Sequence, residues 1–407
     1  MAWRLTLISL LLLPSASAYS VLTHEAMIDS AWEGSIKPLL LRRYPNATSD
    51  ELLKARGYAY GGAIIQDLGY YPFGSRFFSD LVHYVRGGEF IESLVRNAQD
   101  LNEFAFSLGA LAHDAADNCG HPIGVNPVVP MVYPKLRARF GPIVTYEKKP
   151  SAHLKVEFGF DVVQVARGNY APNSFHDFIG FDVAKPLLDR AFHQTYGMSL
   201  KDVFLSVDLA LGTYRYSVSQ IIPKVTRVAW QMKKDEIAAA RPGITRDKFV
   251  YNLSRASFER EWGREYKRPG LFSRLLAALF RIIPKSGPFR ALAFHAPGPD
   301  AEKLFMQSFN VAIDRYRKHL AAVGANNLRL QDLNFDTGEV ARFGQYKMAD
   351  EAWERFVREM DLEKGIDRGA ALAVKDFYDG ALPPDPKTAA AVASLVKFAA
   401  TAPAPGR

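Results

Sequence analysis

Residues 111–122 read Leu-Ala-His-Asp-Ala-Ala-Asp-Asn-Cys-Gly-His-Pro, so that His113, Asp117 and His121 follow one another at intervals of four residues. A helix places residues four apart on one face, about one turn from each other. Imidazole and carboxylate groups presented together in this way suit a zinc ion. Cys119, the only cysteine of the chain, is better explained as a small buried thiol than as a further ligand. The segment therefore predicts a helix that carries metal ligands.

A second pair of ligand-type residues, His153 and Glu157, has the same spacing of four. Three more candidates lie upstream, at His24, Asp67 and His83. The chain has nine histidines, and the five in this set all fall in its first 153 residues. This concentration indicates a metal centre in the N-terminal part of the chain rather than polar groups scattered through a core.

Most of the remaining sequence has apolar residues at the spacing of an amphipathic helix and shows no sustained alternation typical of strands. We therefore expect an all-α fold, a multi-helix domain followed by a mainly helical C-terminal extension. The clearest predicted helices are residues 49–60, 89–112, 152–166, 200–239, 301–322 and 348–360.

Proline and glycine divide the chain. Six prolines between Gly120 and Pro150 predict a long irregular loop, and Pro122 predicts that the first ligand helix ends near Gly120. The Arg241-Pro242-Gly243 sequence predicts a boundary between two parts. The resulting domain hypothesis is a cleaved leader (1–18), a zinc-binding domain (19–240), a C-terminal helical extension (241–400) and a disordered tail (401–407).

The first 18 residues have the features of a secretory signal peptide. Arg4 precedes an apolar run at residues 5–13, and Ala16-Ser17-Ala18 is typical of a cleavage site. We expect an exported protein, periplasmic or extracellular. Cleavage after Ala18 would leave Tyr19 as the N-terminus, and a free α-amine near His24 can deprotonate and bind zinc.

The formal net charge of +8 favours anionic partners, which include both phospholipid membranes and nucleic acid. Residues 270–284 combine a short apolar run with arginines. Such a segment fits a helix in a membrane interface, and taken alone it fits a core helix with arginines at its rim slightly better. The charge does not choose between lipid and nucleic acid, whereas the apolar segment supports a lipid substrate; the sequence indicates no protein partner.

The order of these ligands along the chain resembles the zinc-dependent phospholipase C family, and its site architecture is shared by zinc-dependent single-strand nucleases. The resemblance covers roughly residues 19–200. It is carried by residues 19–24, 62–84, 111–122 and 152–157.

The resemblance implies three zinc ions in an all-α domain, with Asp117 as a bridging ligand. It also makes Asp67 a candidate for orienting or deprotonating the attacking water. The implied ligand sets are Asp67, His83 and His113 for one ion, the amine and carbonyl of Tyr19 with His24 for a second, and His121, His153 and Glu157 for the third.

The implied activity is hydrolysis of a phosphodiester, most simply a phospholipase C that releases diacylglycerol and a phosphorylated head group. Two alternatives stay open: a single-strand nuclease that uses the same ions, and a zinc-stabilised binding protein with little turnover. The head-group preference does not carry over from the family. In the family, an aromatic residue directly follows the zinc-binding aspartate. In this chain that position is Leu68, and aromatic residues come only at Tyr70, Tyr71 and Phe73.

Overall fold

The computed structural model describes residues 20–167, 181–218, 295, 297–360 and 367–401. Several features expected from the sequence lie outside these residues. They are the leader, Tyr19, residues 219–239 of a predicted helix, the boundary near residue 241, the apolar segment 270–284 and the tail after residue 401.

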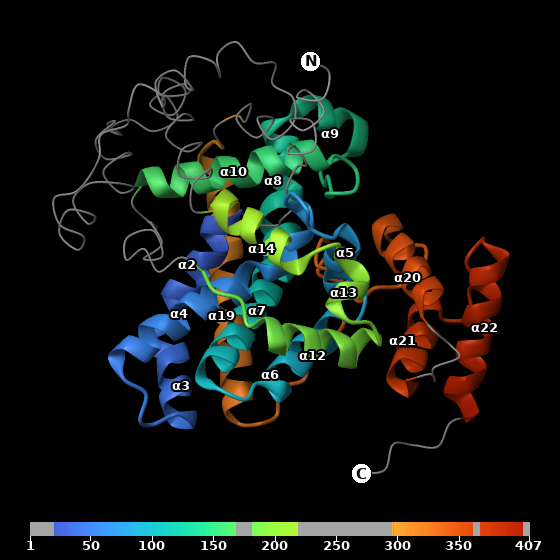
Figure 1. The fold of residues 1–407 in the computed structure, drawn as a ribbon. Helices are drawn as coiled ribbons and strands as arrows, with labels where there is room; N and C mark the ends of the chain where they lie inside the picture. Colours follow the sequence, from blue (N-terminus) through green and yellow to red (C-terminus); the bar gives the residue numbers. More distant parts are fainter. Residues whose placement is uncertain (1–19, 168–180, 219–294, 296, 361–366, 402–407) are drawn as a thin grey trace, which may run out of the picture.

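Helices make up the described part of the chain, and its one β-type pairing is a single bridge between Leu333 and Val340 (Figure 1). The all-α prediction is confirmed. No helix among the described residues is both long and apolar enough to span a bilayer. The elements are α2 (Val21–Ala31), η1 (Trp32–Ile36), α3 (Lys37–Arg43), α4 (Ser49–Ile64), η2 (Ile65–Tyr70), α5 (Arg76–Tyr84), α6 (Gly87–Asn97), α7 (Leu101–Cys119), η3 (Gly120–Val125), α8 (Asn126–Val132), α9 (Pro134–Phe140), α10 (Pro150–Arg167), α12 (Lys185–Tyr196), α13 (Leu200–Val203), α14 (Val207–Tyr216), α19 (Pro299–Gly324), α20 (Lys347–Glu359), α21 (Arg368–Tyr378) and α22 (Pro386–Thr401).

The prediction of a single helix over residues 89–112 is wrong, because the helix is interrupted between α6 and α7. The side chain of Asp100 accepts a hydrogen bond from the Glu103 N–H at 2.8 Å and caps a new helix there. An aspartate in this position satisfies an amide that has no partner inside the helix. A similar cap at Ser206 separates α13 from α14 within the helix expected over 200–239. Apolar periodicity continues across both breaks and therefore conceals them.

The long irregular loop expected between Gly120 and Pro150 is also wrong, since η3, α8 and α9 occupy its first two thirds. Pro127 and Pro134 lie in the first turn of α8 and α9. Proline is well tolerated there because its missing N–H would have no partner anyway. The expected end of the first ligand helix is confirmed: α7 stops at Cys119, and His121 lies in the π-helical turn η3 that follows.

Two glycines bring the central helices α4 and α7 into close contact. A Cβ on Gly62 would lie 1.9 Å from the Phe106 carbonyl oxygen, and one on Gly109 would lie 2.0 Å from that of Ala59. No other residue fits such a backbone approach. Because the helices are so close, the Ala63 carbonyl reaches the ring of His113 on α7.

We expect Gly109→Ala to lower the free energy of unfolding by about 2–3 kcal/mol, because the new methyl group meets backbone atoms that cannot rotate away. Gly212→Ala is the matched control, since Gly212 also lies in a helix but has nothing within 4 Å of its Cβ position. That control should raise stability by roughly 0.5–1 kcal/mol. Chemical denaturation of both variants measures the difference, and equal stabilities would contradict the close helix contact.

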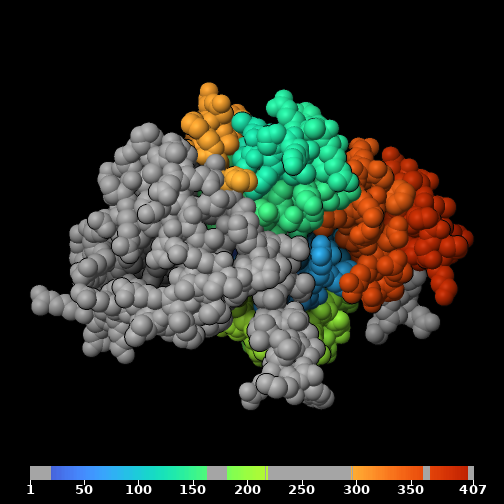
Figure 2. Space-filling model, turned by 90° about the horizontal axis from the view of Figure 1, so that it is seen from above, coloured from blue at the N-terminus to red at the C-terminus, as the bar shows by residue number. Residues whose placement is uncertain are grey.

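The C-terminal helices pack directly on the N-terminal part (Figures 1 and 2). Helix α19 lies along α7, where the Tyr316 hydroxyl donates to the Leu108 carbonyl at 2.9 Å. Helix α20 packs on α5, where the Trp353 indole N–H donates to the Tyr84 carbonyl at 2.8 Å. The described C-terminal residues thus share one hydrophobic core with the helices that carry the predicted ligands.

Candidate metal centre

The eight side-chain ligands predicted from the sequence converge in the core and are all buried. They form three groups in which one ligand atom per residue lies within 4.8 Å of the others. Their positions are His24 on α2, Asp67 on η2, His83 on α5, His113 and Asp117 on α7, His121 on η3, and His153 and Glu157 on α10.

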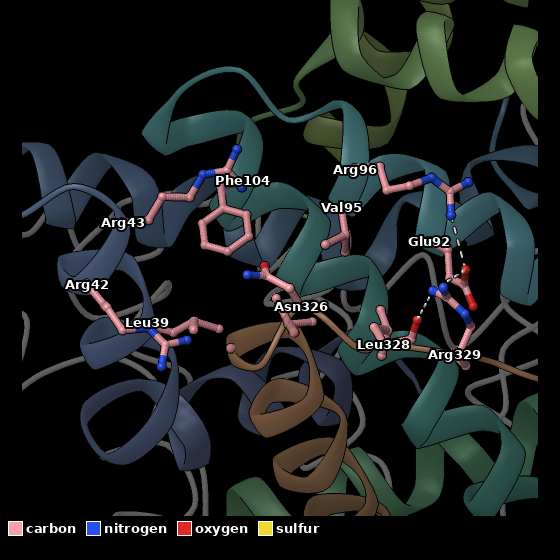
Figure 3. Close-up of a pocket in the computed structure, with 12 residues that line it drawn as sticks. Leu39, Arg42, Arg43, Glu92, Val95, Arg96, Phe104, Asn326, Leu328 and Arg329 are labelled. Carbon is pink, nitrogen blue, oxygen red and sulfur yellow. Dashed lines mark hydrogen bonds and ion pairs between the residues drawn. The ribbon is translucent and has the colours of Figure 1, made fainter. Parts of the chain in front are cut away.

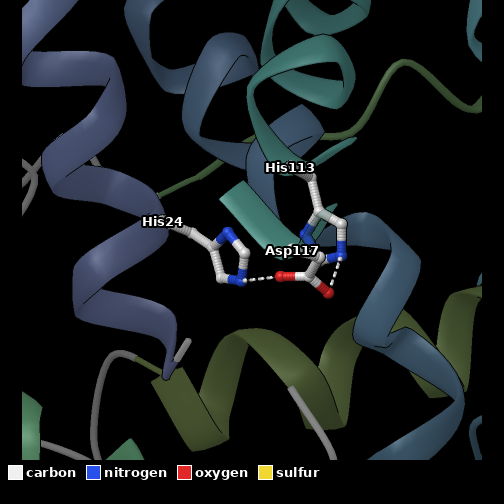
Figure 4. Close-up of side chains that lie close together, drawn as sticks. All are labelled: His24, His113 and Asp117. Carbon is white, nitrogen blue, oxygen red and sulfur yellow. Dashed lines mark ion pairs between the residues drawn. The ribbon is translucent and has the colours of Figure 1, made fainter. Parts of the chain in front are cut away.

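The first group joins α2 to α7 (Figure 4). His24 Nε2 lies 3.4 Å from one oxygen of Asp117, and His113 Nε2 lies 3.2 Å from the other. The two imidazole rings stack with their centroids 4.3 Å apart. Asp117 therefore turns one carboxylate oxygen toward each histidine, as a bridging ligand requires.

The second group shares His113 with the first and adds Asp67 and His83. His83 Nε2 lies 3.6 Å from an Asp67 oxygen, 3.4 Å from His113 Nε2 and 3.7 Å from an Asp117 oxygen. The first two groups are therefore adjacent, and Asp117 lies between them.

The third group consists of His121, His153 and Glu157. His153 Nδ1 lies 3.6 Å from a Glu157 oxygen, and the two imidazole centroids are 5.8 Å apart. The π-helical turn η3 places His121 here, one turn beyond Asp117. Such turns often occur where a helix must redirect a functional side chain.

Backbone carbonyl groups orient three of the imidazoles. The carbonyl of Ser79 bonds His83 Nδ1 at 2.7 Å, that of Ala63 bonds His113 Nδ1 at 2.9 Å, and that of Val144 bonds His153 Nε2. Each carbonyl accepts a hydrogen bond from one ring N–H and so leaves the other nitrogen with a lone pair for a metal ion. This is the usual arrangement around a metal-binding histidine.

Burial keeps two of the histidines neutral. Burial and the nearby His113 lower the pKa of His24 to about 4, and burial together with His121 lowers the pKa of His153 to about 3. Neutral imidazole is the form that binds a metal ion.

Nearby carboxylates help to raise the pKa of two other ligand residues, His113 and Glu157. Burial opposes protonation of His113, but Asp117 outweighs it and raises the pKa of His113 to about 9. Burial, followed by the charge of Asp117, raises the pKa of Glu157 well above its usual value. A divalent cation in the cluster would favour ionised carboxylate and neutral imidazole at every one of these positions.

The residues present fit a metal such as zinc. Within the described part of the chain, His121 Nδ1, His153 Nδ1 and a Glu157 oxygen are buried and make no hydrogen bond. Buried polar atoms without a partner are costly, and native proteins rarely leave them. Nitrogen and oxygen donors in groups of three are typical of zinc sites that keep a position open for water.

Among the residues at this centre that were not found from the sequence, two lie far downstream. The ring of Phe335 meets that of His83 with centroids 5.2 Å apart, and an Asp336 oxygen lies 3.0 Å from His121 Nε2. Neither belongs to a helix or repeats a ligand spacing, so no local pattern indicates them. Two of the aromatic residues singled out in the sequence have different surroundings. Tyr70 lies beside His83, whereas Tyr71 packs against Tyr214 in the core.

The start of α2 is fixed close to the centre. Asp161, one turn beyond Glu157 on α10, accepts hydrogen bonds from the Leu22 N–H at 3.2 Å and the Thr23 hydroxyl at 2.6 Å. These bonds hold the beginning of the described chain near His24. Tyr19, predicted to supply the terminal amine, directly precedes the described residues.

A basic cavity of about 640 Å³ lies elsewhere, between α3, α6 and the end of α19 (Figure 3). Arg42, Arg43, Arg96 and Arg329 line it, together with Phe104 near the start of α7. Phe104 is nine residues before His113, which along a helix is roughly 14 Å. The cavity is therefore separate from the ligand cluster.

The family model described as zinc dependent phospholipase C matches residues 23–206. This segment belongs to the zinc-dependent phospholipase C family. The matched phospholipase C segment contains all eight side-chain ligands, whereas Phe335 and Asp336 lie beyond it. No curated protein and no solved structure matches the chain.

Proposed function

We propose that the protein is an exported phospholipase C that uses three zinc ions to cleave glycerophospholipids into diacylglycerol and a phosphorylated head group. The observation that carries the proposal is the convergence of eight buried imidazole and carboxylate groups, in three adjoining sets, within the phospholipase C segment. Four helices and two helical turns contribute, so the set requires the whole segment to fold.

Two of the aspartates have distinct roles in this proposal, beside the zinc ions themselves. Bound zinc would neutralise the phosphodiester oxygens and lower the pKa of a water from ~16 toward ~7. Asp117 turns one oxygen toward His24 and the other toward His113 and His83, and so lies between the first two ligand groups. Asp67, with an oxygen 3.6 Å from His83 Nε2, is the candidate for orienting the attacking water or accepting its proton.

The proposal also assigns the amine and carbonyl of Tyr19 to the ion held by His24. An amide nitrogen does not serve in this role, so the leader must be removed before that ion can bind. Mass spectrometry of the exported protein should show Tyr19 as the first residue. A different first residue would contradict the amine ligand without affecting the other two ion sites.

The substrate is tested by offering the mature protein two phosphodiesters separately, with and without a chelator. We expect diacylglycerol release from mixed phospholipid micelles, abolished by the chelator and restored by zinc. Cleavage of single-stranded DNA without lipid turnover would instead identify a nuclease. Zinc binding without either reaction would identify a binding protein and contradict the proposed activity.

A further inference from the structure

The third ligand group contacts a carboxylate that comes from outside the family segment. Asp336 is buried, and one of its oxygens lies 3.0 Å from His121 Nε2. The inference drawn from this contact rests on the proposed metal centre.

Asp336 is held in place from several directions. Its second oxygen accepts hydrogen bonds from the Tyr84 hydroxyl at 2.8 Å and from the Tyr346 hydroxyl. Its N–H donates to the Asn334 side chain at 2.9 Å, and its carbonyl accepts from the Asn126 side chain at 2.8 Å. Because two phenols satisfy one oxygen, the other oxygen is directed at His121.

A tight turn holds this segment against the end of α7. Gly338 has a φ of +70°, and a Cβ there would lie 2.7 Å from the Asn118 carbonyl oxygen. Only glycine combines that backbone conformation with so close an approach. The turn therefore holds the Asp336 segment against the end of α7, next to His121.

The two histidines of the third group then have matching environments. His153 bonds the Val144 carbonyl through Nε2, and its Nδ1 faces Glu157. His121 meets Asp336 through Nε2, and its buried Nδ1 makes no hydrogen bond to any described residue. In each ring, one nitrogen is held by a protein oxygen and the other is available to a metal ion.

We propose that Asp336 is the positioning residue of the third zinc site. Its carboxylate accepts the Nε2–H of His121, fixes the tautomer and points Nδ1 at the ion. A carboxylate partner also makes the imidazole a stronger ligand than a neutral acceptor would. The segment beyond the matched family region thus supplies a working part of the metal centre.

Zinc content and affinity, measured by elemental analysis and competition with a chromogenic chelator, test this role. We expect three zinc ions in the wild type, and in Asp336→Ala a third ion bound roughly 10- to 100-fold more weakly. Asp336→Asn should lie between the two, because its amide oxygen still accepts the Nε2–H. Circular dichroism verifies that each variant is folded, and Asp336→Asn keeps the test usable if the alanine variant unfolds.

Asp332→Asn is the matched control. Asp332 is a largely buried carboxylate a few residues upstream whose oxygen accepts from the N–H groups of Gly88 and Glu89, away from the ligands. This variant should retain three ions at wild-type affinity. Unchanged affinity in Asp336→Ala, or equal losses in Asp336→Asn and Asp336→Ala, would overturn the positioning role. A wild type without zinc would overturn the proposed metal centre itself, and this inference with it.

Discussion

Asp117→Asn is expected to lower lipid turnover by more than the roughly 100-fold that follows loss of a residue supporting a ligand. The Asp117 carboxylate approaches His24 with one oxygen and His113 with the other. Asparagine keeps the shape but loses the negative charge and one of the two acceptor oxygens. The negative charge that lies between the first two ligand groups would therefore be lost to both at once.

Asp114→Asn provides the control for this experiment. Asp114 is buried on the same helix and accepts a hydrogen bond from the Asn118 side chain at 2.9 Å, which an asparagine oxygen can also accept. Its turnover should stay close to that of the wild type. Initial rates on micelles and zinc content are compared for the three proteins. Near-normal rates in Asp117→Asn would refute the bridging role.

Removal of the metal is expected to abolish turnover and to destabilise the fold. Without cations, three carboxylates of the ligand set lie close together in a buried site. A ligand present at 1,000 times its Kd stabilises a protein by about 4 kcal/mol, and chelation removes that contribution for each ion. We therefore expect Tm to fall by several degrees on addition of a strong chelator.

Differential scanning fluorimetry with parallel rate measurements tests this prediction. Added zinc should restore both Tm and turnover, whereas magnesium should restore neither, because it prefers oxygen ligands in an octahedral shell. A chelated protein that kept its full Tm and its full rate would show that neither stability nor turnover depends on a bound metal ion, and would contradict the proposed function.

The sequence predicts those parts of the centre that depend on local geometry. Spacing of four residues places His113 beside Asp117 and His153 beside Glu157, because one helical turn determines both distances. The upstream candidates His24 and His83 come from separate helices, and their grouping follows from the resemblance rather than from spacing.

Other features of the fold and of the metal centre depend on tertiary contacts or on a single hydrogen bond that caps a helix. The break before α7 depends on one hydrogen bond that the Asp100 side chain accepts from the Glu103 N–H, which apolar periodicity does not reveal. The contact of Asp336 with His121 depends on a turn that Gly338 allows to approach α7 and on the hydroxyls of Tyr84 and Tyr346. His121 and Asp336 are far apart in the sequence and at no regular spacing, so no local pattern predicts their contact.

The downstream origin of Asp336 bears on how the protein matures. Translation delivers residues 24–157 well before residue 336, so under the proposed function every side-chain ligand is synthesised before the residue that supports His121. The proposed role of Asp336 then predicts that the third set is fully loaded only after the C-terminal part has folded onto the ligand helices. A product that stops before residue 336 would carry every ligand of the family segment and still hold its last ion poorly.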